Sequence, residues 1–185
     1  LGKIKYIELN RKNYGPIRDD VSSIWDLASH DLSIIKYLFP SARINNQKYL
    51  RSSITKRKIY DIYSIKFNLV NTIVNINVSW LYPEKIRQIL IIGSKKILMF
   101  DELDTLKPIK IYDVIKSYPS ASDIPLFYFN PQKKFIIKEP IFPKFKKVFP
   151  LYSQLKYCLA NILTKNKIIT DGKFALEISK ELSKF

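Results

Sequence analysis

The sequence predicts an α+β fold in which a mainly antiparallel sheet carries helices packed on one face. Apolar residues recur with a two-residue period in the middle of the chain and with a helical period near its start and end. A run of strands followed by helices is typical of this fold class. The length of 185 residues fits a single domain spanning residues 1–185, which can bury about 70% of its unfolded surface.

The first expected element is a strand over residues 3–10, followed by a turn at Asn13-Tyr14-Gly15-Pro16. A helix then runs to Pro40, because one of its sides is apolar when the residues are projected at about 3.6 per turn. Asp31 falls on this apolar side, where a carboxylate needs a cation or a hydrogen-bond donor. We therefore expect Asp31 to be structural and to have a partner. The apolar side consists of Ile24, Leu27, Ala28, Ile34, Ile35, Leu38 and Phe39.

The middle of the chain alternates between apolar and polar residues, as half-buried strands do. This alternation predicts strands over 64–69 and 74–80. Two further segments, 86–92 and 95–101, flank Gly93-Ser94, a two-residue connection suited to a hairpin. The sheet is therefore expected to be mainly antiparallel.

Shorter strands are expected at 107–113 and 133–138, with a polar, proline-marked connection over 117–131 between them. The prolines that follow predict an extended segment that is not a central strand. They are Pro140, Pro143 and Pro150.

Two helices end the chain. The first begins behind Pro150 and includes Cys158, which we expect to be a buried small hydrophobe. The second follows Thr170-Asp171-Gly172 and is expected to bury four side chains, those of Phe174, Ala175, Ile178 and Leu182.

The composition excludes several kinds of site. One cysteine allows no intrachain disulfide, and one histidine leaves no transition-metal cluster. Four glycines provide no glycine-rich loop for a dinucleotide, so this chain alone is expected to bind no cofactor. No apolar stretch approaches the ~20 residues that span a bilayer, and the N-terminus does not resemble a cleavable signal. We expect a cytoplasmic protein that does not bind membranes.

The net charge of +16 raises the question of a polyanionic partner. The basic residues are spread along the chain, and lysine, isoleucine, asparagine and tyrosine are abundant together, as AT-rich coding would produce. A nucleic-acid footprint should be clustered. We therefore interpret the charge first as a background bias, and nucleic-acid binding is the less favoured interpretation.

A candidate acid/base pair lies on the first helix. Asp26 and His30 are four residues apart, so they share one face, opposite the apolar side. A neighbouring carboxylate can orient an imidazole and raise its basicity, as proton transfer near neutral pH requires. The alternative is a capping box, in which Ser23 is the N-cap, Asp26 reaches back to it, and His30 is an ordinary solvated side chain.

Four segments in order resemble the substrate domain of the Gfo/Idh/MocA family of NAD(P)-dependent oxidoreductases. In this family a Rossmann domain comes first and binds the cofactor, and an antiparallel α/β domain closes over the substrate. The chain resembles only the second half. The segments are residues 2–4 with 11–18 (RKNYGPIR), 25–31 (WDLASHD), 78–87 (VSWLYPEKIR) with 92–96, and 170–172.

The resemblance implies that His30 accepts the proton of a substrate hydroxyl, and that Asp26 either orients His30 or holds an adjacent hydroxyl. Arg11, Asn13 and Arg18 are candidate substrate contacts, which would offer donors to a carboxylate or phosphate. The cofactor, NAD or NADP, and the family's Glu-Lys-Pro lysine would belong to the missing domain. The resemblance thus implies a split or truncated sugar or nucleotide-sugar dehydrogenase that is inactive alone.

Partners follow from the same resemblance: a separate Rossmann-domain polypeptide, a sugar or nucleotide-sugar substrate, and a second copy in a homo-oligomer formed through the sheet face. Two alternatives remain open. One is a basic, non-catalytic nucleic-acid-binding module that uses lysines interleaved with aromatic residues. The other is an inactive remnant that self-associates. The aromatic residues in question are Tyr60, Tyr63, Phe67 and Trp80.

Overall fold

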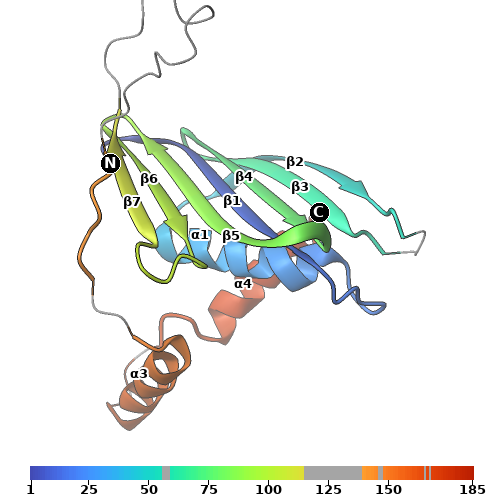
Figure 1. The fold of residues 1–185 in the computed structure, drawn as a ribbon. Helices are drawn as coiled ribbons and strands as arrows, with labels where there is room; N and C mark the ends of the chain where they lie inside the picture. Colours follow the sequence, from blue (N-terminus) through green and yellow to red (C-terminus); the bar gives the residue numbers. More distant parts are fainter. Residues whose placement is uncertain (56–58, 115–138, 146–147, 165, 167) are drawn as a thin grey trace, which may run out of the picture.

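A single sheet with helices on one face forms the body of the protein (Figure 1). The computed structural model describes residues 1–55, 59–114, 139–145, 148–164, 166 and 168–185. The α+β class predicted from the sequence is confirmed. The strand expected at 133–138 and the connection expected at 117–131 lie outside the described residues.

The sheet has seven strands with the first strand at its centre. This strand pairs in parallel with β4 on one side and antiparallel with β5 on the other, and every other pairing is antiparallel. The expectation of a mainly antiparallel sheet is therefore confirmed. In sheet order the strands are β2 (Ile44–Ser52), β3 (Ile62–Leu69), β4 (Thr72–Ser79), β1 (Ile4–Tyr14), β5 (Leu81–Gly93), β6 (Lys96–Asp101) and β7 (Ile109–Asp113).

Several boundaries differ from the predicted ones, and no strand was predicted where β2 lies. Both β3 and β5 begin earlier than expected, at Ile62 and Leu81. The first strand continues to Tyr14 rather than ending near residue 10, because both neighbouring strands keep pairing with it. The hairpin turns at residues 94–95, one position later than predicted, and Gly93 ends β5. A side chain at Gly93 would collide with the backbone of Leu1, since its Cβ would lie 2.2 Å from the Leu1 carbonyl oxygen.

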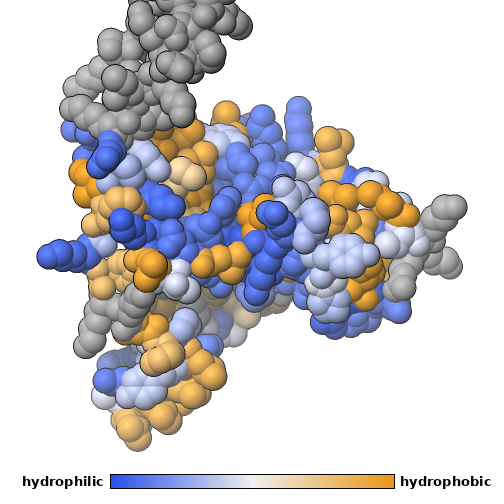
Figure 2. All heavy atoms as spheres, in the orientation of Figure 1, coloured by the Kyte–Doolittle hydropathy of each residue, from blue (hydrophilic) through white to orange (hydrophobic). Residues whose placement is uncertain are grey.

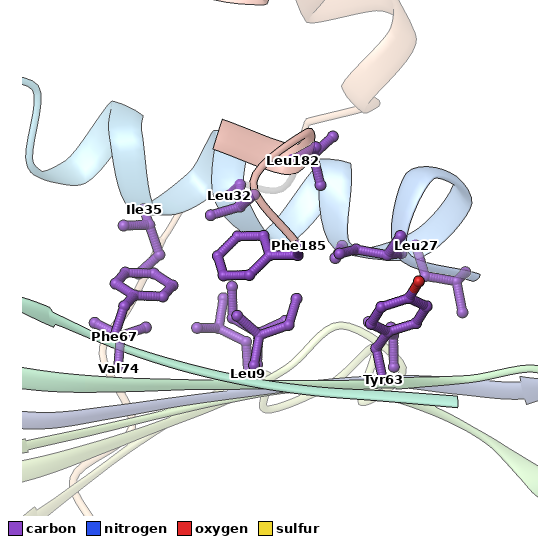
Figure 3. Close-up of a cluster of buried hydrophobic side chains, with 14 of the residues drawn as sticks. Leu9, Leu27, Leu32, Ile35, Tyr63, Phe67, Val74, Leu182 and Phe185 are labelled. Carbon is purple, nitrogen blue, oxygen red and sulfur yellow. The ribbon is translucent and has the colours of Figure 1, made fainter. Parts of the chain in front are cut away.

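The helices that cover the sheet are a π-helical turn, η1 (Ile24–Ala28), which continues directly into α1 (Ser29–Leu38), and the terminal α4 (Gly172–Leu182). Their apolar side chains meet those of the central strands in the core (Figure 3). The core residues labelled there are Leu9, Leu27, Leu32, Ile35, Tyr63, Phe67, Val74, Leu182 and Phe185.

The terminal helix packs by one narrow edge. Asp171 caps it by accepting a hydrogen bond from the Phe174 backbone N–H at 2.9 Å. Ile178 and Leu182 are buried as predicted, Phe174 is half-buried, and Ala175 is exposed. The prediction for Ala175 was wrong because α4 contacts α1 along a stripe too narrow to cover its position.

The helix α3 (Pro150–Thr164) lies apart from the sheet (Figure 1). None of its described residues is buried, and Cys158 is only half-buried, so the prediction of a buried cysteine was wrong. Helical periodicity shows that a helix has an apolar side, and it does not show whether anything packs there. Figure 2 shows apolar atoms of this helix on the surface. Among the described residues, no helix has the length and hydrophobicity needed to cross a membrane.

Candidate active site

The candidate site lies where the central strands reach the π-helical turn. In β1, Ile7 and Leu9 point toward the helices and are fully buried, so alternation places Arg11 on the same side near the end of the strand. Arg87 of β5 is the direct cross-strand neighbour of Arg11. Two guanidinium groups therefore meet below the start of α1.

An ion pair anchors the helix to the sheet at this point. Arg11 Nε donates to Asp31 Oδ1 at 3.0 Å, and the Asp31 side chain is 2% exposed. Asp31 thus has the partner that its place on the apolar side required. Burial raises the pKa of Asp31 to about 6, although Arg11 acts to lower it. The other oxygen of Asp31 is buried and has no hydrogen-bond partner among the described residues.

Asp26 is held by a tryptophan. Trp80 is fully buried between β4 and β5, and its indole Nε1 donates to Asp26 Oδ2 at 2.8 Å. The backbone of Trp80 is fixed on both sides, by Gly15 N–H and by the Asp61 carbonyl. The capping-box alternative is wrong, because Ser23 makes no side-chain cap and instead donates to the Tyr60 carbonyl.

His30 is exposed at the start of α1, directly after the π-helical turn. Partial desolvation of the ring, together with the charge of Arg11, lowers its pKa below 6.5. The nearby Asp26 carboxylate acts in the opposite direction, so the predicted increase in basicity is outweighed. The imidazole is consequently neutral at neutral pH, which is the state that accepts a proton.

The three predicted substrate contacts are not equivalent. Arg11 lies within the cluster around His30, whereas Asn13 positions a second arginine by accepting from Arg87 Nη2 at 2.6 Å. Arg18 is on the following loop and is engaged by Asp20 through two hydrogen bonds of 2.9 and 2.6 Å. Of these three residues, only Arg11 both acts on His30 and keeps guanidinium N–H groups that have no acceptor among the described residues.

Sequence reasoning missed three residues of this cluster. Two of them, Arg87 and Glu102, shift the pKa of His30 through their charges. The third, Trp80, donates a hydrogen bond to Asp26. Both Trp80 and Arg87 are part of segment 78–87, whose resemblance to a family hairpin was a usable signal. Glu102 had no such signal, because it enters the cluster through a backbone bond to the Arg87 carbonyl.

The described residues do not fit a dinucleotide or a metal cluster. The four glycines are isolated from one another: Gly2 precedes β1, Gly15 opens the connection from β1 to η1, Gly93 ends β5 and Gly172 begins α4, so none of them is part of a glycine-rich phosphate loop. No group of three metal-binding side chains occurs in the part of the chain that the structure describes.

Comparison with solved structures places the fold among oxidoreductases. The chain matches UDP-N-acetylglucosamine 3-dehydrogenase GnnA from Acidithiobacillus ferrooxidans with a TM-score of 0.76 and 17% identity, covering 99% of this chain and 52% of that one. It matches an aldose-aldose oxidoreductase from Caulobacter crescentus with a TM-score of 0.70 and 13% identity, covering 100% of this chain and 53% of that one. A dehydrogenase (MviM) from Clostridium difficile gives a TM-score of 0.66 and 15% identity, with coverage of 98% and 54%.

The chain spans about half the length of the solved structures it matches. No protein-family model matches the sequence, and no curated protein matches it. The fold is thus that of one half of several oxidoreductases, at least two of which are named for sugar substrates.

Proposed function

We propose that this chain is the substrate-binding and proton-accepting part of an NAD(P)-dependent sugar or nucleotide-sugar dehydrogenase. The observation that carries the proposal is a neutral, exposed His30 beside Asp26 and two arginines, in a fold shared with oxidoreductases. The Gfo/Idh/MocA resemblance assigns the same two residues to proton transfer. The nicotinamide cofactor would be bound by residues outside this single domain.

The residues of this chain have distinct parts in such a reaction. A neutral imidazole nitrogen of His30 takes the proton of a substrate hydroxyl. Asp26, held by the Trp80 indole, stabilises the imidazolium that forms. Arg11 is fixed at one nitrogen by Asp31 and presents its remaining N–H groups to the substrate. The carbon that bears this hydroxyl would lose its hydrogen as a hydride to the oxidised nicotinamide cofactor, which in this proposal belongs to a separate dinucleotide-binding polypeptide, so the chain alone would be inactive.

Two partners belong to the proposal. One is a dinucleotide-binding polypeptide, and the other is a second copy of the chain at the outer face of the sheet. Polar side chains of β1 on that face satisfy one another, since Glu8 accepts from both Tyr6 and Asn10. Exposed apolar residues of β2, β4 and β6 lie on the same face. These residues are Leu50, Ile73 and Met99, with exposed fractions of 78%, 39% and 42%.

The nucleic-acid alternative loses its aromatic residues in the structure. Tyr63, Phe67 and Trp80 are 3%, 0% and 0% exposed, so none of them can stack on a base. The fourth ring, that of Tyr60, is half-buried, so three of the four aromatic residues named for this alternative lie in the core.

The test combines the chain with a dinucleotide-binding polypeptide encoded beside it and measures NAD(P)H formation with a panel of sugars and nucleotide sugars. His30→Gln should lower kcat by about 10²–10⁴-fold, the usual contribution of a general base, and leave the circular dichroism spectrum unchanged. Tyr37→Phe is the matched control, because Tyr37 is 58% exposed on the same helix and outside the cluster. Equal activity of the histidine variant and the control would contradict the proposal. Absence of turnover with every sugar would favour the inactive remnant.

A further inference from the structure

The helix α3 leaves its apolar side open to solvent. A surface helix normally turns that side toward a core, whereas the half-buried residues of α3 include the polar Ser153 and Asn161. Four apolar residues, spaced three or four positions apart, are each more than half exposed. We call these residues the α3 stripe. They are Leu151, Leu155, Leu159 and Ile162.

The contact that α3 makes with its own chain is on the other side of the helix. The hydroxyl group of Tyr157 accepts a hydrogen bond of 3.1 Å from the backbone N–H of Ile169, in the segment that leads to α4. Tyr157 is two positions from both Leu155 and Leu159, so helical geometry turns its side chain away from the stripe. Among the described residues, packing of α3 against its own chain therefore leaves the stripe uncovered.

The charge around α3 argues against a second copy of the chain on the stripe. Residues 144–167 contain six lysines and no acidic residue. Two copies that met through α3 would bring these lysines together, and like charges across an interface oppose association. A partner with an apolar patch rimmed by acidic side chains is complementary in both shape of polarity and charge.

The position of α3 indicates which partner this is. Figure 1 shows α3 on the side of the sheet that α4 and the His30-bearing α1 cover. The fold match covers 98–100% of this chain, α3 included, but only 52–54% of the matched chains. The matched proteins thus have further chain, not included in these 185 residues, that is available to cover such a helix. The proposed function needs a dinucleotide-binding polypeptide on this same side.

We infer that the α3 stripe is the docking surface for the dinucleotide-binding polypeptide, and that the contacting patch of this partner is apolar with an acidic rim. The inference rests on the proposed function and adds where its partner binds. The outer face of the sheet is then left for the second copy of the chain.

The single cysteine provides the assay, because Cys158 is half-buried and adjoins Leu159 of the stripe. A coloured aromatic disulfide reagent reports the rate at which this thiol exchanges. The full chain is mixed with the dinucleotide-binding polypeptide encoded beside it, whose own thiols are first blocked with iodoacetamide. We expect the rate to fall at least about tenfold in the complex, because the bound partner removes access to the thiol.

A pair of variants that add the same charge tests the stripe itself. Leu155→Glu places a carboxylate in the middle of the stripe and should weaken the complex at least about tenfold in analytical ultracentrifugation. Ala160→Glu is the matched control, since Ala160 is exposed on the same helix and lies about 140° around it from Leu155. The control should bind as the unmodified chain does. Added salt should weaken the unmodified complex, because it screens the lysines from the acidic rim.

The outcomes separate this inference from the proposed function. If the mixture forms NAD(P)H while Cys158 keeps its full reactivity, the docking surface is elsewhere and only the inference is overturned. Equal weakening by Leu155→Glu and Ala160→Glu, or a complex indifferent to salt, would overturn it too.

Other occupants of the stripe are tested in the absence of the polypeptide. Protection of Cys158 by raised concentrations of the chain itself, or by phosphatidylglycerol vesicles, would assign the stripe to that occupant and refute the inference. If the polypeptide neither binds the chain nor forms NAD(P)H with it, both the inference and the proposed function are refuted.

Discussion

Replacing Arg11 with methionine should expose how strongly the candidate site depends on one buried ion pair. The substitution keeps most of the apolar stem and removes the cation that faces Asp31. The two side chains are 12% and 2% exposed, so the remaining carboxylate would be left unpaired in the protein interior. Removal of one partner from such a pair costs roughly 3–5 kcal/mol near neutral pH.

The loss should depend on pH, with a sign that follows from Asp31. Its pKa is raised from 3.8 to about 6, which corresponds to about 3 kcal/mol of unfavourable burial of the charge. Between roughly pH 4 and 6 the folded chain holds a proton that the unfolded chain releases. Protonation of Asp31 therefore stabilises the fold as the pH falls through this window, and ionisation destabilises it above the window.

Without Arg11 the pKa of Asp31 rises further, because Arg11 acts to lower it. The deficit of Arg11→Met should therefore be largest near roughly pH 7.5 and smaller near roughly pH 5, where the carboxyl group is protonated and needs no cation. Urea unfolding followed by circular dichroism at the two pH values measures this difference. Arg18→Met is the matched control and should show no measurable loss at either pH, since Arg18 and Asp20 form an exposed pair. A deficit that does not change with pH would refute the assignment of the cost to an ionised Asp31.

Two further predictions concern the support of the site and the packing of the helices. Trp80→Phe removes the indole donor of Asp26 and should cost about 2–3 kcal/mol in the free energy of unfolding. A double-mutant cycle with Asp26→Ala, which removes the acceptor, checks this prediction, because strictly additive losses would contradict the bond. The second prediction compares two leucines. Leu32→Ala, at a fully buried position of α1, should lower the free energy of unfolding by about 2–5 kcal/mol. Leu155→Ala, at a 55% exposed position of α3, should change it by no more than about 0.5 kcal/mol. Comparable losses for the two leucine variants in urea unfolding would show that α3 packs onto the body of the protein.

The sequence alone was sufficient for those elements whose pattern is local. Two-residue alternation predicted β3 and β4, the Gly93-Ser94 connection predicted the hairpin of β5 and β6, and the 3.6-residue period predicted the helix that carries Asp26 and His30. The need of Asp31 for a partner was also readable, because the helical projection placed a carboxylate among apolar residues. Each of these inferences uses residues less than about five positions apart, the range over which backbone geometry alone sets which side chains share a face.

The partners of the candidate site were decided by tertiary structure. Arg11 and Asp31 are 20 residues apart, and Trp80 and Asp26 are 54 apart. Arg87 meets Arg11 only because β5 pairs with β1 in one particular register, and a shift of one residue would turn Arg87 to the other face of the sheet.

The sequence by itself therefore determined the helices and most of the strands, with the exception of β2, and it placed Asp26 and His30 on one face of a helix. The tertiary structure decided that the pKa of the imidazole is lowered rather than raised, because this pKa depends on desolvation and on charges brought in from β1, β5 and the end of β6. It also decided that α3 keeps its apolar side exposed among the described residues. Periodicity records which side of an element is apolar, whereas burial and electrostatics depend on what chain folding places against it.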